Sequence, residues 1–247
     1  MKSTNYRSQF KIIGYLCLIL TMSLLFLRCS KDQNPAPEEQ IPGFTGVNTQ
    51  AADRTTRFIY IVPSDSKLHQ DYTQAVENCA TSLSQWYKDQ LNNGKTFHLN
   101  EQIVETIQSE HPATWFSADN GDVSGSDPNF YFFNNAKSDI MTLLGDSYNE
   151  DKYTYVVYID AQGSTGAGYL RLCIMPQNDL LGLTGQMEED IPRWIGGTGH
   201  ELGHGFGLDH LDNQDPKALM WTGYTLYPDC YFSQEDLDIL NSNSFIY

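Results

Sequence analysis

The sequence predicts an α+β fold in which helices pack on one mixed β-sheet. Short runs rich in β-branched and aromatic residues alternate with stretches of helical periodicity between residues 57 and 205. The 247 residues are 40% hydrophobic and 13% aromatic, which excludes collagen-like, low-complexity and wholly disordered chains. After the N-terminal stretch, no apolar run is long enough to cross a bilayer.

The first predicted elements are a strand, a helix and a second strand. Residues 58–62 form a β-rich run that ends at Pro63, which predicts a buried strand. Between residues 71 and 91 apolar side chains recur mostly at spacings of three and four, so an amphipathic helix is expected there. Asn-Asn-Gly at 92–94 ends it. Residues 97–107 alternate loosely and predict a second strand.

The middle of the chain continues this alternation. Residues 117–129 are rich in turn formers, and Asp127-Pro128 predicts the start of a helix that runs to about residue 144. Residues 153–159 give the clearest pattern of a central strand.

The last predicted elements surround the glycine-rich loop 163–168. This loop loosely resembles a dinucleotide-binding loop, but it leads into a strand and not a helix, so nucleotide binding is not expected. The strand is predicted at 169–175 and stops at Pro176. A helix follows at 191–204, and one further helix is expected near the C-terminus.

The N-terminus has the pattern of an export signal. A basic segment, residues 2–11, precedes 16 apolar residues, 12–27, a run that is short for a spanning helix. Together with Cys29 this resembles a bacterial lipoprotein signal (1–29), although Arg28 replaces the small residue usual at that position. A signal anchor and an ordinary cleaved signal are the alternatives. Each places the mature chain outside the cytoplasm: at the cell surface, in the periplasm or secreted.

The mature chain is strongly acidic. The whole chain has a formal charge of −16, and four of its 15 basic residues lie in the leader, so the mature part carries 11 basic and 31 acidic side chains, a net of −20. Such a surface repels phosphate backbones and anionic lipids, which excludes nucleic acid as a partner and leaves only a lipid anchor as membrane contact. We expect a monomer. Residues 30–56 are polar and aperiodic, which predicts a flexible tether or a short pro-segment.

Cysteine usage excludes a disulfide scaffold. The mature domain contains only Cys79, Cys173 and Cys230, which allow at most one internal disulfide.

The segment from His200 to His210 carries the chemistry. His200 and His204 lie four residues apart, so both imidazoles face the same side of a helix and can bind one ion. Glu201 lies beside them, where its carboxylate can take a proton from a metal-bound water. Gly207 permits the turn that brings His210 back as third ligand. Three imidazoles leave one position of Zn²⁺ open, as in catalytic sites.

The alternative is a helix with three incidental surface histidines, and its glycine content argues against this. A glycine within a helix costs roughly 1 kcal/mol relative to alanine, so such a helix needs close tertiary packing. Six glycines lie in the predicted helix or at its end: Gly196, Gly197, Gly199, Gly203, Gly205 and Gly207.

The frame 200–210 resembles that of the metzincin metallopeptidases, and Leu208-Asp209-His210 is most similar to the matrixin branch. Met220 stands where metzincins place the methionine turn beneath the metal ligands. Residues 232–240 are similar to the matrixin C-terminal helix, with Ser233 as N-cap and Asp236 three residues later.

The resemblance implies a zincin-like catalytic domain over residues 57–247, divided into subdomains 57–207 and 208–247. It implies a twisted mixed sheet, two long helices, an active-site helix and one catalytic Zn²⁺. It further implies that residues 221–231 form a pocket wall. By the same resemblance the strand 169–175 would be the sheet edge that pairs with an extended peptide, an ordinary interior strand being the alternative. The residues expected to contact substrate are Tyr169, Leu170, Arg171 and Leu172.

Departures from the family limit the expected ligands. Thr222 stands two residues after Met220, where some metzincins have a zinc-binding tyrosine, so no fifth protein ligand is expected. The remaining histidines, at 69, 98 and 111, lie far upstream, so a second, structural zinc is not expected either. The loop 119–127 offers oxygen ligands for Ca²⁺ but lacks EF-hand spacing, and a solvated loop is the preferred interpretation.

The sequence therefore predicts a zinc endopeptidase that acts on extracellular proteins or peptides. A binding lipoprotein with an idle zinc fold is one alternative, but it would not need Glu201. A zinc hydrolase of a non-peptide amide is the other.

The resemblance also leads us to consider latency, because many metzincins are held inactive by an upstream thiolate or carboxylate that fills the open zinc position. A lipidated Cys29 has no thiolate to give. Any such carboxylate would come from Asp32, Glu38, Glu39 or Asp53, unless the segment is merely a spacer.

Overall fold

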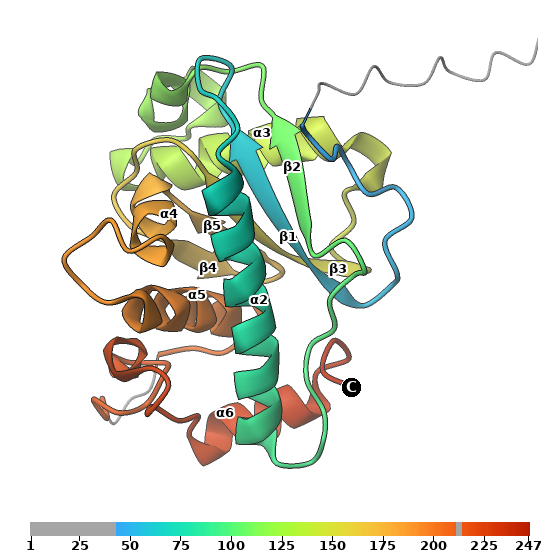
Figure 1. Cartoon of the computed structure of the whole chain (residues 1–247), viewed down its shortest axis with the longest axis vertical. Helices are drawn as coiled ribbons and strands as arrows, with labels where there is room; N and C mark the ends of the chain where they lie inside the picture. The colour runs from blue at the N-terminus through green and yellow to red at the C-terminus, as the bar shows by residue number, and fades with distance from the viewer. Residues whose placement is uncertain (1–42, 211–213) are drawn as a thin grey trace, which may run out of the picture. The chain divides into compact units, whose positions relative to one another are not determined.

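Five strands form one twisted sheet in the computed structural model, which describes residues 43–210 and 214–247. The strand order is β2-β1-β3-β5-β4 (Figure 1). Neighbouring strands are parallel except for β4, which pairs antiparallel with β5 and forms one edge. The strands are β1 (Thr55–Val62), β2 (Val104–Gln108), β3 (Tyr153–Ile159), β4 (Ala167–Tyr169) and β5 (Leu172–Met175).

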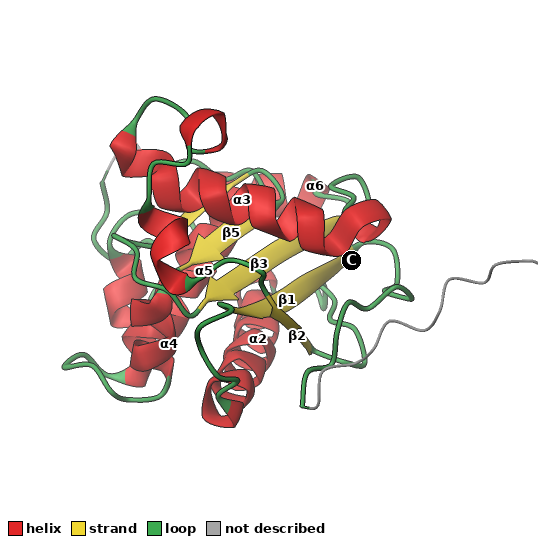
Figure 2. Cartoon of the chain, turned by 90° about the horizontal axis from the view of Figure 1, so that it is seen from above, coloured by secondary structure: helices red, strands yellow, loops and turns green. Residues whose placement is uncertain are grey.

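Helices cover both faces of this sheet. Helix α3 (Tyr131–Leu144) packs on one face, and α2 (Gln70–Leu91) packs on the other (Figure 2). The strands serve both faces because successive side chains point in opposite directions. In β1, Ile59 and Ile61 join the α3 side, whereas Phe58 and Tyr60 join the α2 side.

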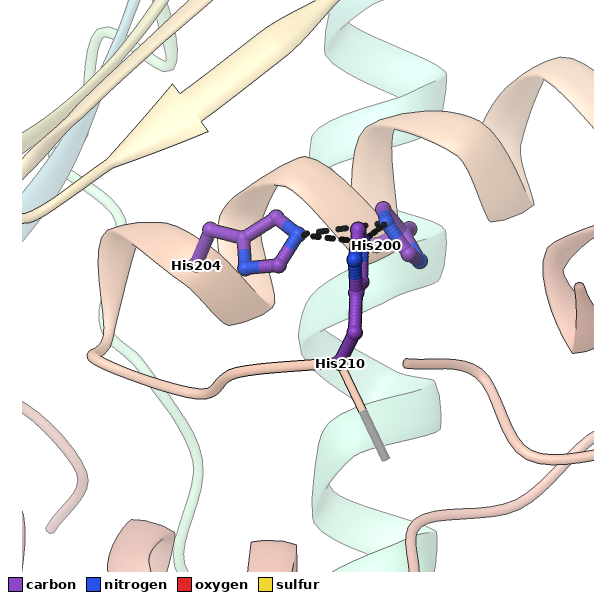
Figure 3. Close-up of side chains that lie close together, drawn as sticks. All are labelled: His200, His204 and His210. Atoms are coloured by element: carbon purple, nitrogen blue, oxygen red, sulfur yellow. Dashed lines mark hydrogen bonds between the residues drawn. The ribbon is translucent and has the colours of Figure 1, made fainter. Parts of the chain in front are cut away.

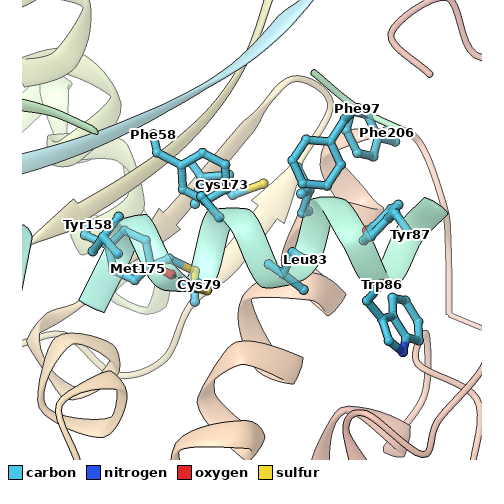
Figure 4. Packing of buried hydrophobic residues seen from close by; sticks show 14 of the residues in the cluster. Phe58, Cys79, Leu83, Trp86, Tyr87, Phe97, Tyr158, Cys173, Met175 and Phe206 are labelled. Carbon is cyan, nitrogen blue, oxygen red and sulfur yellow. Dashed lines mark hydrogen bonds between the residues drawn. The ribbon is translucent and has the colours of Figure 1, made fainter. Parts of the chain in front are cut away.

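The core on the α2 side also holds α5 (Ile191–Gly205) in place. Leu83 and Tyr87 of α2 lie in this core (Figure 4). The Tyr87 hydroxyl donates a hydrogen bond of 2.9 Å to the carbonyl of Gly199 in α5. From the sheet, the Tyr158 hydroxyl lies 2.6 Å from that of Thr198. Two buried tyrosines thus tie α5 to its neighbours.

Most predicted elements are present, and the fold class is confirmed. The strand at 97–107 is shorter than expected and begins only at Val104, as β2. The single strand predicted at 169–175 is wrong: it is a hairpin of β4 and β5, which turns at Leu170-Arg171 with Arg171 at φ 67°. The prediction missed α4 (Gln177–Leu183). The last helix, α6 (Gln234–Ser242), has the expected capping box of Ser233 and Asp236.

The folded region begins before residue 57, so the expected boundary is too late. The backbone N–H groups of Thr45 and Asn48 donate to the side chains of Thr106 and Glu105, at 2.8 and 2.7 Å. Polar residues of this segment therefore hydrogen-bond to β2. The polar composition of the segment gave no indication of this order. Asp53 is exposed and pairs with Lys152 at 3.1 Å.

Several of the predictions concern residues that the structure does not describe. These are the leader with Cys29, the acidic residues 32, 38 and 39, and Leu211. Within the described ranges, no helix is both long and apolar enough to cross a membrane. Cys79, Cys173 and Cys230 are buried free thiols.

Candidate metal centre and active site

Three imidazoles converge at one point beside α5. His200 and His204 project from successive turns of the helix, and His210 returns from the following loop (Figure 3). Their Nε2 atoms form a triangle in which each pair is 3.2 Å apart. Gly207, at φ 93°, provides the turn between helix and loop that the sequence predicted. The structure therefore brings together the three predicted ligands.

Backbone carbonyls fix the protonation state of two of these rings. Nδ1 of His200 lies 2.7 Å from the carbonyl oxygen of Leu219, and Nδ1 of His204 lies 2.7 Å from that of Leu208. A carbonyl oxygen only accepts, so each Nδ1 carries the proton and donates it. The Nε2 atoms of His200 and His204 therefore present lone pairs toward the centre of the triangle. Lone pairs at this distance repel one another unless a cation lies between them.

The triangle fits a zinc ion. With Zn–N bonds of about 2.0–2.1 Å and tetrahedral angles, ligand nitrogens lie roughly 3.3 Å apart, close to the observed 3.2 Å. Burial lowers the pKa of His200 to about 4, which keeps its ring neutral and ready to bind a metal. Among the residues that the structure describes, these histidines are the only group of three or more side chains placed to share an ion. His69, His98 and His111 lie elsewhere, and the loop 119–127 contributes no such group.

Met220 lies directly behind the ligand helix. Its side chain is buried, and its sulfur occupies the space where a side chain at Gly203 would project. The preceding carbonyl, of Leu219, is the one that orients His200. The segment predicted as the methionine turn therefore supports the ligands through both its backbone and its side chain.

Glu201 follows His200 in the ligand helix and is partly buried. Burial raises the pKa of its carboxyl group to about 7, and the N–H of Gly168 opposes this shift. A carboxylate with a pKa near neutrality is suited to accept and return a proton. Gly168 of β4 approaches so closely that a Cβ there would overlap with the backbone of Glu201. The edge strand and the ligand helix are thus in backbone contact at the site.

A cavity of about 410 Å³ opens at this point. Residues 165–168 form one side, the ligand face of α5 another, and residues 221–224 a third. The expected wall after Met220 is thus partly confirmed. Tyr224 belongs to this expected wall, whereas sequence reasoning missed the lining residues Asp179 and Arg193. A helical projection of α5 would have found Arg193, which shares the face of His200 and His204.

The four residues expected to contact substrate are not among those that line the cavity. Tyr169 and Leu170 are exposed, at 69% and 52% of their surface, and Leu172 is buried in the interior strand β5. The guanidinium of Arg171 lies 3.9 Å from the ring centroid of Phe245. The expected contact residues lie too far along the chain, because the sheet edge is formed by the short strand β4, which ends at Tyr169.

The comparisons with known proteins give structural neighbours only. No protein-family model matches the sequence, and no curated protein sequence matches it. Wild-type OgpA from Akkermansia muciniphila is similar in structure, with a TM-score of 0.58 and 16% identity over 81% of this chain and 63% of that chain. Catalytically inactive OgpA in complex with an O-glycopeptide substrate, glycodrosocin, has a TM-score of 0.53 and 17% sequence identity. The match covers 78% of this chain and 61% of that chain. Archaemetzincin from Methanopyrus kandleri has a TM-score of 0.42 and 15% sequence identity, and the match covers 75% of this chain and 94% of that chain.

This chain therefore spans less than two thirds of the length of OgpA. At this identity the likeness concerns the fold. The assignment to the matrixin branch stays a prediction.

Proposed function

We propose that this protein is a zinc-dependent endopeptidase. The observation that carries the proposal is the convergence of three Nε2 atoms, each pair 3.2 Å apart, beside a partly buried glutamate. Without an ion, facing lone pairs and a partly buried carboxyl group both destabilise a helix, so a purely structural helix would not keep this arrangement.

The chain's own groups would divide the work. His200, His204 and His210 would hold the ion, which when bound polarises a carbonyl group and lowers the pKa of water. Glu201 accepts the proton of the attacking water and returns it to the leaving amine. The carbonyls of Leu219 and Leu208 keep two imidazoles in the required tautomer.

The edge of the sheet supports a peptide as substrate. One side of β4 has no partner strand in the sheet order, so its backbone groups can pair with an extended chain. Residues 165–168 of this segment line the cavity beside Glu201. OgpA, which shares the fold, has been solved with an O-glycopeptide substrate, and this supports peptide substrates here.

The leader supports export, and we propose that the mature protein is a lipid-anchored or secreted enzyme acting on extracellular proteins.

The test is the cleavage of a mixed-sequence peptide library by the purified chain, read by mass spectrometry. We expect internal peptide bonds to be cleaved, the activity to stop with a chelator and to return with Zn²⁺. The matched control is Glu201→Gln, which keeps the metal ligands and should lose activity by about 10²- to 10⁴-fold. A zinc-loaded protein that cleaves no peptide would favour an idle binding fold or a non-peptide amide as substrate. Unchanged turnover in the Glu201→Gln variant would remove Glu201 from its role.

A further inference from the structure

Arg193 places a cation in the wall of the active-site cavity. Apart from the histidines, it is the only basic side chain among the described residues that line this cavity. Its guanidinium makes no ion pair or hydrogen bond with the residues that the structure describes. Arg57, by contrast, is fully buried and donates two hydrogen bonds to Glu105, at 2.7 and 2.6 Å. Arg57 therefore has the contacts of a structural arginine, and Arg193 does not.

The guanidinium of Arg193 is directed toward the metal ligands. One of its nitrogens, Nη1, lies 3.0 Å from the point where a Cβ at Gly197 would stand. Gly197 precedes His200 by three residues, which corresponds to about 4.5 Å along the helix axis. Arg193, Gly197 and His200 line the same cavity, so the guanidinium faces the space beside the metal ligands.

Two aromatic rings hold this guanidinium in place. Its Cζ lies 4.3 Å from the ring centroid of Trp194 and 5.2 Å from that of Tyr224. The ring of Tyr224 in turn lies 5.3 Å from that of His200. Stacking restrains a guanidinium but leaves its N–H donors free, because the donors lie in the plane of the group.

The surrounding charges are negative. Asp179 lines the same cavity with 5% of its surface exposed, and it attracts the charge of Arg193 without forming a hydrogen bond with it. On its other side Arg193 borders a second cavity of about 520 Å³, which Glu189 and Asp190 also line. A substrate that carries a negative charge thus meets one attractive group in an otherwise acidic cleft.

We propose that Arg193 binds a carboxylate of the substrate, carried by an acidic side chain next to the scissile bond, and so determines which bonds are cleaved. This inference rests on the proposed peptidase function. The planar fork of N–H donors matches a carboxylate in a bidentate pair, and the partly enclosed site weakens the competition from water. The negative charge of Asp179 opposes the binding of a carboxylate. If Asp179 rather than Arg193 determined the substrate preference, peptides with a basic side chain would be favoured.

The test uses short peptides of the form acetyl-(Ala)₃-Xaa-(Ala)₃-amide, where Xaa is Glu, Gln or Lys. The wild-type protein should cleave a bond next to Glu with a kcat/KM about 10- to 100-fold above that for Gln, the range of a hydrogen bond to a charged group. In Arg193→Gln the Glu/Gln ratio should fall to near one, and in Arg193→Lys it should be intermediate. Arg54→Gln, which removes an exposed arginine, should keep the wild-type ratio. A ratio within one protein does not depend on the folded fraction.

A second set of peptides identifies the source of the carboxylate. The Gln peptide with a free C-terminus replaces the amide. If it is cleaved as fast as the Glu peptide, and Arg193→Gln abolishes this gain, the bound carboxylate is the chain end, and the acidic side-chain proposal is overturned.

Binding separates this inference from the proposed function. Calorimetry with the Glu201→Gln variant measures the affinity for the Glu and Gln peptides without turnover. If no peptide is cleaved but the Glu peptide binds more tightly, and Arg193→Gln removes the difference, the peptidase function fails and carboxylate binding by Arg193 stands. Equal affinity and equal cleavage of the Glu and Gln peptides would overturn the inference, as would a preference for Lys.

Discussion

The central strands and the ligand helix place their residues by different means. Every residue of β1 and β3 is buried, and their large side chains fill the space between the sheet and its helices. Helix α5 instead approaches its neighbours through backbone. A side chain at Gly203 would meet Met220, and one at Gly168 in β4 would overlap with the backbone of Glu201.

Because of this difference, the free energy of unfolding and the geometry of the metal site should depend on different residues. Substitutions in the strands remove apolar contacts, so they should lower the free energy of unfolding and leave the metal site of the folded fraction unchanged. Substitutions at the close approaches of α5 should displace Glu201 or a metal ligand at a smaller cost in stability. The predictions below test this division.

The largest effect on stability is expected in the sheet. Ile61→Ala removes a fully buried side chain from β1 and should lower the free energy of unfolding by about 4 kcal/mol. Ile239→Ala, at a half-exposed position of α6, is the matched control and should cost below about 1 kcal/mol. Urea unfolding measures both, and zinc affinity should not change. A weaker zinc affinity in folded Ile61→Ala would show that the two regions are not separable.

Gly168→Ala tests the ligand helix side of the comparison. The new Cβ meets backbone, which cannot move aside, so we expect a loss of about 3 kcal/mol and a marked loss of peptidase activity. In Gly166→Ala the Cβ meets the flexible end of Met175, 2.8 Å away, and the cost should be below about 1 kcal/mol. Unfolding curves and activity are measured side by side. Equal effects of the two substitutions would contradict the backbone contact.

Asp179 predicts a pH dependence of stability. Burial raises the pKa of its carboxyl group from 3.8 to about 7, so the folded chain binds this proton more tightly than the unfolded chain. Its favourable contribution is complete below pH 4 and is lost as the pH rises to about 7. Asp179→Asn should therefore be more stable than the wild type at pH 8, by on the order of 2 kcal/mol, and equal to it at pH 4.

Urea unfolding in the presence of a chelator, at both pH values, measures this difference. A variant that is less stable than the wild type at pH 8 would show that the charged form of Asp179 is stabilised in the folded protein.

The smallest effect concerns a helix end outside both regions. Ser233 accepts a hydrogen bond of 3.1 Å from the N–H of Asp236 at the start of α6. Ser233→Ala should cost about 1 kcal/mol and leave zinc affinity and activity unchanged. Thermal unfolding combined with a zinc titration measures both. Reduced activity would mean that α6 contributes to the site.

The sequence was sufficient to predict the elements that have a long, regular pattern and the metal ligands that lie in one short segment. Helix α2 and the histidines of α5 follow from spacing, and strands β1 and β3 follow from runs of β-branched and aromatic residues. The hairpin of β4 and β5 was missed because its turn uses Leu170-Arg171, without a glycine or asparagine to mark it. Helix α4 has only seven residues, too few to show a period.

The rest of the site could not be predicted because it is assembled by tertiary contacts. Asp179 reaches the cavity through α4, more than twenty residues before His200. The role of Gly168 depends on the approach of an edge strand to α5. The segment from Thr45 to Asn48 looked like a tether because its hydrogen bonds to β2 involve polar groups, which a hydrophobic pattern does not reveal.

The most direct test of the central claim is the zinc content of the protein after equilibrium dialysis, measured by atomic absorption. The account predicts one zinc per wild-type chain and a large loss in His204→Ala, which deletes a ligand. His98→Ala should keep one zinc, because His98 stacks on Tyr247 away from the triangle, with ring centroids 4.0 Å apart. A wild-type chain without zinc, or a His204→Ala variant with full zinc content, would contradict the account.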